Sequence, residues 1–119
     1  MRKILFAEDD PHWQVIVEEI ARLLGYGIDH CHNAKEAEEK LFKKKRRYAL
    51  VITDVRMPEE SGLVLCEKLS KLRPELPVLI LTGYRTKKLY KTVERLGIPY
   101  IFKPATVSEL LTAIRNLAK

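Results

Sequence analysis

The sequence has few of the residues that mark zinc, disulfide or membrane proteins. It contains only two cysteines, Cys31 and Cys66, which lack CxxC spacing and lie in apolar stretches, so we expect both to be small buried hydrophobic residues. No apolar run approaches the roughly 20 residues that a membrane-spanning helix needs. The apolar part of the N-terminus, residues 4–7, is too short for a signal peptide. These absences favour a cytoplasmic protein without a membrane partner.

Internal repeats, low-complexity segments and interdomain linkers are also absent. The 119 residues fall in the usual range for one domain, and a hydrophobic content of 46% with 32% charged residues is typical of globular proteins. We therefore expect a single domain over residues 1–119.

Acidic residues are the scarcer charge, and the excess of basic ones gives a net charge of +6. Such an excess raises the question of nucleic-acid binding. The chain has no helix-turn-helix signal, no zinc ligands and no aromatic residues interleaved with the basic ones, which argues against direct nucleic-acid binding. A basic run at residues 43–47 fits the solvated C-terminal end of a helix, where positive charge is favourable.

Five short apolar runs alternate with segments of helical periodicity. The expected strands are residues 4–7, 28–31, 49–52, 78–81 and 100–102. Because parallel strands need a long crossover, usually a helix, this alternation predicts an α/β fold whose parallel sheet is covered on both faces.

The expected helices have recognisable starts and apolar faces. Pro11 suits a first helical turn, and Asn33 with Glu36 and Thr106 with Glu109 have capping-box character. The apolar spacing predicts an inward face for Trp13, Ile16, Val17, Ile20, Leu23 and Leu24, for Leu65, Cys66, Leu69 and Leu72, for Leu89, Val93 and Leu96, and for Val107, Leu110, Leu111, Ile114 and Leu117.

Polar side chains follow four of the five expected strands. Glu8 and Asp9 follow the first strand, Asp54 the third, Thr82 the fourth and Lys103 the fifth. In open parallel sheets, ligands bind beyond the carboxyl ends of the strands, so we expect these groups to meet at one edge. Clustered carboxylates resist ionisation unless a cation offsets their charge. A hard divalent ion with oxygen ligands does this, which predicts an Mg²⁺ site, with Mn²⁺ as a second candidate.

Four ordered motifs resemble the receiver domains of bacterial two-component response regulators, of the chemotaxis-regulator type. Residues 4–10 resemble the first strand and its acidic pair, and residues 51–62 the phosphorylation loop with its Met-Pro and Gly. Residues 81–83 and 100–104 complete the set. The resemblance covers nearly the whole chain and implies a doubly wound (βα)5 flavodoxin-like three-layer sandwich with strand order 2-1-3-4-5.

The resemblance also implies a role for each residue of the metal site. Asp54 resembles the phosphoacceptor, and Glu8 and Asp9 the acidic pair, with Asp9 as the direct ligand. Asp54 and the backbone carbonyl of Arg56 would join Asp9 on Mg²⁺.

Three further residues resemble the family's catalytic and switch positions. Thr82 corresponds to the switch hydroxyl, Lys103 to the family's lysine and Tyr100 to the switch aromatic; the Lys103–Pro104 bond would be cis. Pro99 stiffens the entry to Tyr100, so a simple packed aromatic is the alternative for that residue.

The function implied is that of a phosphoacceptor in two-component signal transduction, not of a turnover enzyme. A sensor histidine kinase or phosphotransfer protein would donate the phosphoryl group in an Mg²⁺-dependent reaction, and hydrolysis would end the signal. The output partner or domain would bind through the fourth helix, fifth strand and fifth helix. Because Arg85, Lys87, Lys88, Lys91 and Arg95 crowd that fourth helix, an acidic partner is a further hypothesis.

Some residues depart from the common pattern or have a simpler interpretation. Arg56 and Tyr84 are bulky and lie near the expected water path, so we expect them to tune the lifetime of the phosphorylated state. Asp10 fits a helix N-cap better than a metal ligand. The three histidines, His12, His30 and His32, lack metal-ligand spacing and are interpreted as surface or edge residues.

Two other functions fit the same residues less well. A phosphotransferase or phosphatase for small substrates would use similar aspartyl chemistry, but the sequence offers no second catalytic acid and no cap domain for it. A receiver that acts only as an unphosphorylated scaffold would not need the intact set of acid, hydroxyl and lysine.

Overall fold

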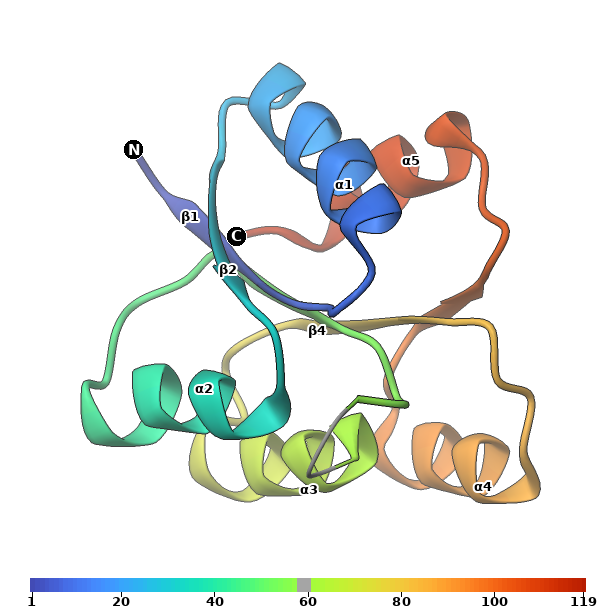
Figure 1. Ribbon diagram of the computed structural model, residues 1–119. Helices are drawn as coiled ribbons and strands as arrows, with labels where there is room; N and C mark the ends of the chain where they lie inside the picture. The colour runs from blue at the N-terminus through green and yellow to red at the C-terminus, as the bar shows by residue number, and fades with distance from the viewer. Residues whose placement is uncertain (58–60) are drawn as a thin grey trace.

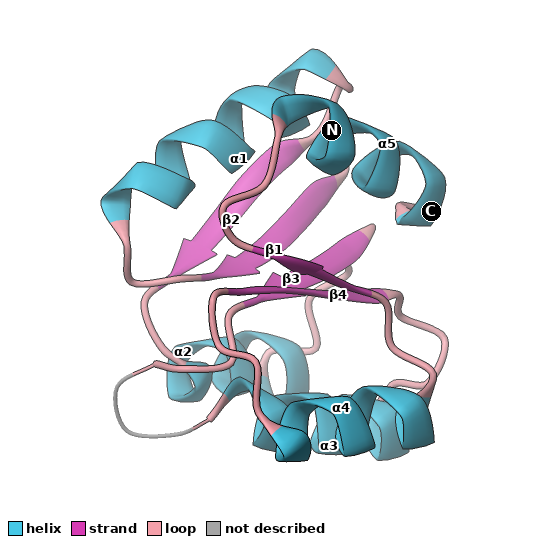
Figure 2. Cartoon of the chain, turned by 90° about the vertical axis from the view of Figure 1, so that its right-hand side faces the viewer, coloured by secondary structure: helices cyan, strands magenta, loops and turns pink. Residues whose placement is uncertain are grey.

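A five-stranded parallel sheet forms the centre of the molecule. The computed structural model describes residues 1–57 and 61–119, so the Pro58 part of the predicted Met-Pro turn lies outside the described residues. The strands are β1 (Lys3–Ala7), β2 (Gly27–Cys31), β3 (Leu50–Thr53), β4 (Val78–Thr82) and β5 (Tyr100–Phe102). They pair in parallel in the order β2-β1-β3-β4-β5, which confirms the predicted order (Figure 2).

Helices cover both faces of this sheet. Helices α1 (Pro11–Leu23) and α5 (Val107–Leu117) lie on one face, as Figures 1 and 2 show. On the other face lie α2 (Ala34–Glu38), its π-helical continuation η1 (Glu39–Lys43), α3 (Gly62–Leu72) and α4 (Lys87–Leu96). The result is the predicted three-layer sandwich. None of the described helices is long and apolar enough to cross a membrane.

Two hydrophobic cores follow from the alternation of side chains along each strand. Ile4 and Phe6 of β1 belong to the core under α1 and α5. Leu5 and Ala7 belong to the core under α2, α3 and α4. Successive side chains of a strand point to opposite faces, and a strand covered on both faces is therefore apolar throughout. This explains why β1, β3 and β4 appear in the sequence as apolar runs.

The two predicted capping boxes have different outcomes. Thr106 and Glu109 form the complete box at the start of α5, each side chain bonding the other residue's backbone N–H. Asn33 accepts from Glu36 N at 2.8 Å, but the carboxylate of Glu36 accepts from His32 N instead of from Asn33 N. The box at Asn33 is therefore incomplete, because the Glu36 side chain bonds the backbone N–H of the residue before the N-cap.

Three apolar residues predicted to face inward are exposed instead. They are Leu23, Leu72 and Val107, with exposed fractions of 68%, 64% and 58%. Each is a terminal residue of its helix and lies three residues from a buried one, namely Ile20, Leu69 and Leu110 respectively. A three-residue step falls about 60° short of a full helical turn, so at a helix end the side chain rotates off the buried face.

Candidate metal and phosphoryl site

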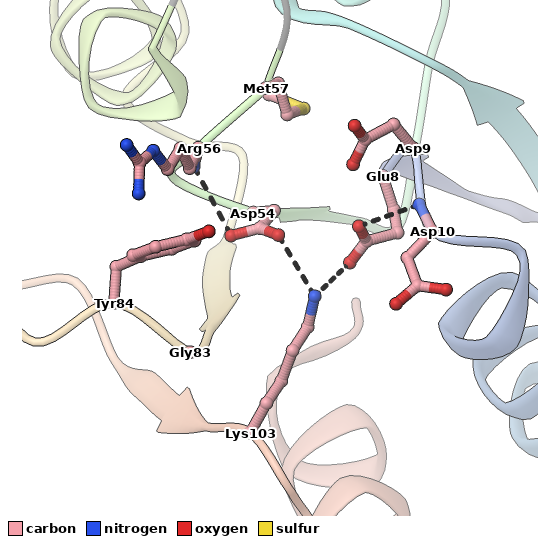
Figure 3. A pocket seen from close by; sticks show the side chains of 9 residues that line it. All are labelled: Glu8, Asp9, Asp10, Asp54, Arg56, Met57, Gly83, Tyr84 and Lys103. Atoms are coloured by element: carbon pink, nitrogen blue, oxygen red, sulfur yellow. Dashed lines mark hydrogen bonds and ion pairs between the residues drawn. The ribbon is translucent and has the colours of Figure 1, made fainter.

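A hollow of about 660 Å³ lies at the carboxyl ends of the strands, where the sequence predicted a ligand site (Figure 3). It is lined by Glu8, Asp9, Asp10, Asp54, Arg56, Met57, Gly83, Tyr84 and Lys103. Because the sheet is parallel, the loops after β1, β3, β4 and β5 all open on this edge. Segments far apart in the sequence thus supply one site.

Lys103 joins two buried carboxylates at the base of the hollow. Its Nζ lies 2.5 Å from Glu8 Oε1 and 3.0 Å from Asp54 Oδ2. Glu8 is fully buried and Asp54 is 5% exposed. Removal of two charged groups from water costs several kcal/mol each, so an ammonium placed between them is a condition for keeping both ionised.

The second oxygen of Asp54 is held by the backbone. Oδ1 accepts from Val55 N at 2.6 Å and faces Arg56 N at 3.4 Å. The hydroxyl of Thr53 donates to the Asp54 carbonyl at 2.8 Å, which fixes the main chain at this residue as well. The carboxylate therefore has one oxygen on backbone amides and the other on Lys103, in a fixed orientation.

Burial and neighbouring charge alter the acidity of Glu8 and Lys103. Burial raises the pKa of Glu8 to about 6; the negative charge of Asp54 adds to the rise, and the hydrogen bond from Lys103 opposes it. Burial alone would lower the pKa of Lys103, but its hydrogen bonds to Glu8 and Asp54, with their charges, hold that pKa above its ordinary value. The lysine is therefore a permanent cation here.

The donor set fits a hard divalent cation. Glu8, Asp9 and Asp54 each present a carboxylate oxygen, and these oxygens lie within 4.8 Å of one another. Lys103 pairs with Glu8 and Asp54, which leaves the charge of Asp9 without this ammonium. The pKa of Glu8 is raised mainly by burial, and the charge of Asp54 adds to the rise. Mg²⁺ prefers oxygen ligands with several waters retained, which suits an open hollow bordered by carboxylates.

The structure brings most of the predicted site residues together, with two exceptions. Asp9, Arg56 and Tyr84 line the hollow beside the residues described above. Thr82 does not line it: its side chain is fully buried and its Oγ1 accepts from Tyr84 N at 3.2 Å. Tyr100 lies outside the hollow on β5, where it is 41% exposed.

Arg56 and Tyr84, the two bulky residues at the entrance, contact each other. The guanidinium carbon of Arg56 lies 4.5 Å from the centre of the Tyr84 ring, a cation–π arrangement. Asp10 caps α1 by accepting from His12 N at 2.9 Å, as predicted, although its side chain also borders the hollow.

Sequence reasoning missed one contact of the lysine. Trp13, expected only as part of the inner face of a helix, has its ring centre 5.4 Å from Lys103 Nζ. Because α1 begins directly after the acidic residues, the first turn of this helix returns to the site. The Lys103–Pro104 bond is cis, as predicted.

Fold and site together define a receiver-type α/β protein with a central aspartate. The chain belongs to the response regulator receiver domain family, whose model matches residues 4–115. It is 32% identical over 109 residues to the two-component response regulator ORR26 of Oryza sativa, covering 91% of this chain and 19% of that protein. It is 31% identical over 84 residues to the receiver protein CpdR of Brucella abortus, covering 71% of this chain and 68% of that protein. The chain spans about a fifth of the length of the plant regulators that it matches.

Solved receiver structures share the fold. The response regulator TrrA of Thermotoga maritima, solved in complex with Mg²⁺ and BeF, is 29% identical with a TM-score of 0.86, covering 98% of this chain and 99% of that one. A CheY-like receiver domain from Methanospirillum hungatei is 27% identical with a TM-score of 0.88, covering 98% and 92%. Receiver domains are signalling domains that bind Mg²⁺ through an acidic cluster and interact with histidine kinases and output domains.

Proposed function

We propose that residues 1–119 form one cytoplasmic receiver domain in which Asp54 accepts a phosphoryl group from a sensor histidine kinase or phosphotransfer protein. The observation that carries this proposal is the bridge made by Lys103, which holds the carboxylates of Glu8 and Asp54 together in an open hollow. In the reaction, a carboxylate oxygen of Asp54 forms a bond to phosphorus as the bond from phosphorus to the donor imidazole nitrogen breaks. The product is an acyl phosphate on Asp54.

The residues of the hollow supply orientation and charge stabilisation. A carboxylate is a modest nucleophile, so acceleration comes mainly from positioning and from offsetting the developing negative charge. Backbone amides of Val55 and Arg56 orient Asp54, and Lys103 offsets negative charge on the transferring group. Glu8, Asp9, Asp54 and the Arg56 carbonyl would hold Mg²⁺, which supplies further charge neutralisation when bound, with Mn²⁺ as a substitute.

The output side of the proposal depends on Thr82 and Tyr100. Thr82 Oγ1 already accepts from Tyr84 N, and a hydroxyl can donate at the same time, so it can bond a phosphoryl oxygen and draw in the loop after β4. Tyr100 packs against Tyr90 and Phe102 with ring centres 6.2 and 5.3 Å away, at the α4–β5 surface. Movement of that loop would change the packing of Tyr100 and hence the α4–β5–α5 face that meets an output partner.

Mass spectrometry after treatment with acetyl phosphate and Mg²⁺ tests the central step. The wild-type protein should gain one phosphoryl mass, and Asp54→Asn should gain none. An equal gain in both proteins, or no gain in either, would contradict the assignment of Asp54.

The contact between Arg56 and Tyr84 is proposed to limit the access of water to the acyl phosphate. Arg56→Ala or Tyr84→Ala opens the entrance of the hollow, so each should speed dephosphorylation several-fold. The decay of the phosphorylated mass after removal of the donor measures this. Thr86→Ala, at the nearby N-cap of α4, is the control variant, since its hydroxyl bonds Leu89 N and not the hollow. Unchanged decay in both entrance variants would refute the role.

A further inference from the structure

The backbone carbonyl of Glu8 accepts hydrogen bonds from two side chains at once. Gln14 Nε2 donates to it at 3.0 Å from α1, and His30 Nε2 lies 2.9 Å away on β2. A carbonyl oxygen has two lone pairs, so both bonds can form together. This oxygen is thereby tied to the helix that follows the acidic residues and to the neighbouring strand.

These bonds matter because no side chain among the described residues holds the carboxylate of Asp9. Asp9 is exposed, and within residues 1–57 and 61–119 its carboxylate makes no hydrogen bond or ion pair. Its position therefore depends on the main chain. The peptide unit between Glu8 and Asp9 is planar, so fixing the Glu8 carbonyl also fixes the direction in which the chain enters Asp9.

The other polar groups around Asp9 are fixed as well. Glu8 N donates to Cys31 O at 3.0 Å, and Asp10 N donates to Glu8 Oε2 at 3.1 Å. The carbonyl of Asp10 accepts from Gln14 N at 3.2 Å, the first bond of α1. Of these described backbone groups, the Glu8 carbonyl is the one held by side chains of other elements, which makes Gln14 and His30 the replaceable parts of this arrangement.

We infer that Gln14 and His30 are positioning residues that hold Asp9 and Glu8 in register for a divalent cation. The inference rests on the proposed Mg²⁺ site and extends it to two residues that do not themselves bind the ion. A backbone carbonyl can only accept, so His30 must carry its hydrogen on Nε2. Its ring packs edge-on against His32, with 4.7 Å between ring centres, and lies tilted against Phe6 at 6.2 Å.

Titration with MgCl₂ alone, without a phosphodonor, tests the inference. Trp13 is the only tryptophan and lies beside Lys103, so its fluorescence reports binding in the hollow. Gln14→Met and His30→Phe keep the size of each side chain and remove the donor. Each should weaken Mg²⁺ binding about 10-fold, the lower end of the range for residues that orient metal ligands. The fold-loss of Mg²⁺ affinity in the double variant should be smaller than the product of the two single losses, because both hydrogen bonds end on the same carbonyl oxygen.

Two controls separate positioning from general damage to the fold. His30→Gln restores an N–H at a similar reach and should recover most of the affinity. His32→Phe keeps the ring contact to His30 and should bind Mg²⁺ like the wild type, while thermal unfolding without metal shows how far each variant is destabilised. Affinity that follows the melting temperature, with no recovery in His30→Gln, would overturn the inference.

The tautomer of His30 gives a readout that does not depend on metal. Long-range ¹H–¹⁵N NMR of the imidazole should show Nε2 protonated at neutral pH, and a neutral Nδ1–H form would overturn the inference. If wild-type protein bound no Mg²⁺ while His30 showed the expected tautomer, the proposed metal site would fail and the hydrogen-bonded arrangement would stand. If the wild type bound Mg²⁺ and the variants bound it equally well, the positioning role alone would fail.

Discussion

At the scale of single residues, Glu8 combines full burial with a carboxylate neighbour. Lys103 offsets part of the repulsion, yet burial still raises the pKa of Glu8 to about 6. In the unfolded chain an ordinary glutamate titrates near its usual value of about 4.3. The folded protein thus binds this proton more tightly than the unfolded chain does, so Glu8 makes folding stability depend on pH.

The first prediction follows from the sign of that shift. A group with a raised pKa in the folded state stabilises the fold fully below its unfolded pKa, and this contribution is lost as pH rises through the folded pKa. The free energy of unfolding of the metal-free wild type, measured relative to Glu8→Gln by urea denaturation, should therefore fall between about pH 4.5 and pH 6. A difference curve that is flat or rises over this interval would contradict the assignment.

Gly62 is a second residue whose size is dictated by the site. A Cβ at this position would lie 1.9 Å from the carbonyl oxygen of Asp54, whereas a Cβ at Gly83 would meet nothing closer than Lys103 Cβ at 4.0 Å. Gly62 N also donates to Val55 O at 2.8 Å, so the close approach belongs to the loop that presents Asp54. The glycine lets α3 begin against Asp54.

Alanine at these two glycines should therefore have unequal effects. Gly62→Ala forces the backbone apart and should lower the free energy of unfolding by about 1–3 kcal/mol. Gly83→Ala should change it by less than about 0.5 kcal/mol. Chemical denaturation of both variants measures the difference, and equal effects would mean that the loop after β3 moves aside at little cost.

At the scale of whole elements, the edge strand β2 is bound to η1 and to the segment that follows it. Asp29 on β2 accepts from Lys40 Nζ at 2.5 Å, from Tyr48 OH at 2.5 Å and from Arg46 Nη1 at 3.2 Å. Burial alone would raise the pKa of Asp29, but the hydrogen bonds from Lys40 and Tyr48 lower it. The basic run predicted as a solvated helix end is exposed over residues 43–47, and Arg46 also pairs with Asp29 on β2.

Asp29→Asn should loosen this edge of the sheet. The amide has one oxygen where the carboxylate has two and carries no charge, so it cannot accept from all three donors. We therefore expect the free energy of unfolding to fall by roughly 1–3 kcal/mol at neutral pH. The pKa of Asp29 is lower in the folded protein than in the unfolded chain. Its contribution to the free energy of unfolding is therefore present above the unfolded pKa and is lost as pH falls through the folded pKa. Lys44→Ala, at an exposed neighbour in the basic run, is the control and should leave urea denaturation unchanged. Equal curves for Asp29→Asn and wild type at pH 7 would contradict the role.

Element types and their order were predictable from the sequence, and side-chain contacts between elements were not. Apolar runs and helical spacing predicted five strands in a parallel sheet, and the pattern is strongest in β1, β3 and β4, which are buried on both faces. The strand order was implied by the resemblance to receiver domains. The motif residues at strand ends predicted most of the hollow. Three contacts depend on how the elements and loops pack: Thr82 Oγ1 with Tyr84 N, Trp13 with Lys103, and His30 with the Glu8 carbonyl. No local signal in the sequence encodes those contacts.

At the scale of the whole molecule, the acidic hollow opposes folding until a cation binds. The chain carries a net charge of +6, yet the carboxylates of Glu8, Asp9 and Asp54 gather at the carboxyl edge of the sheet, where Lys103 pairs with Glu8 and Asp54. The unfolded chain disperses these charges in water and does not bind a divalent ion with comparable affinity. By linkage, a ligand that binds only the folded state stabilises it by RT ln(1 + [L]/Kd).

Mg²⁺ should therefore raise the melting temperature of the whole domain. At an Mg²⁺ concentration 100 times its Kd, the free energy of unfolding should increase by about 2.7 kcal/mol. For a domain of this size, this corresponds to a rise in melting temperature of about 10 °C. Differential scanning calorimetry at constant ionic strength, with KCl replacing MgCl₂ in the reference, separates site binding from screening. Asp9→Asn removes one carboxylate that Lys103 does not pair, so the metal-free variant should melt no lower than the wild type and gain much less from Mg²⁺. A rise of the same size in KCl, or in Asp9→Asn, would mean that the ion acts on the general charge of the protein and not at this hollow.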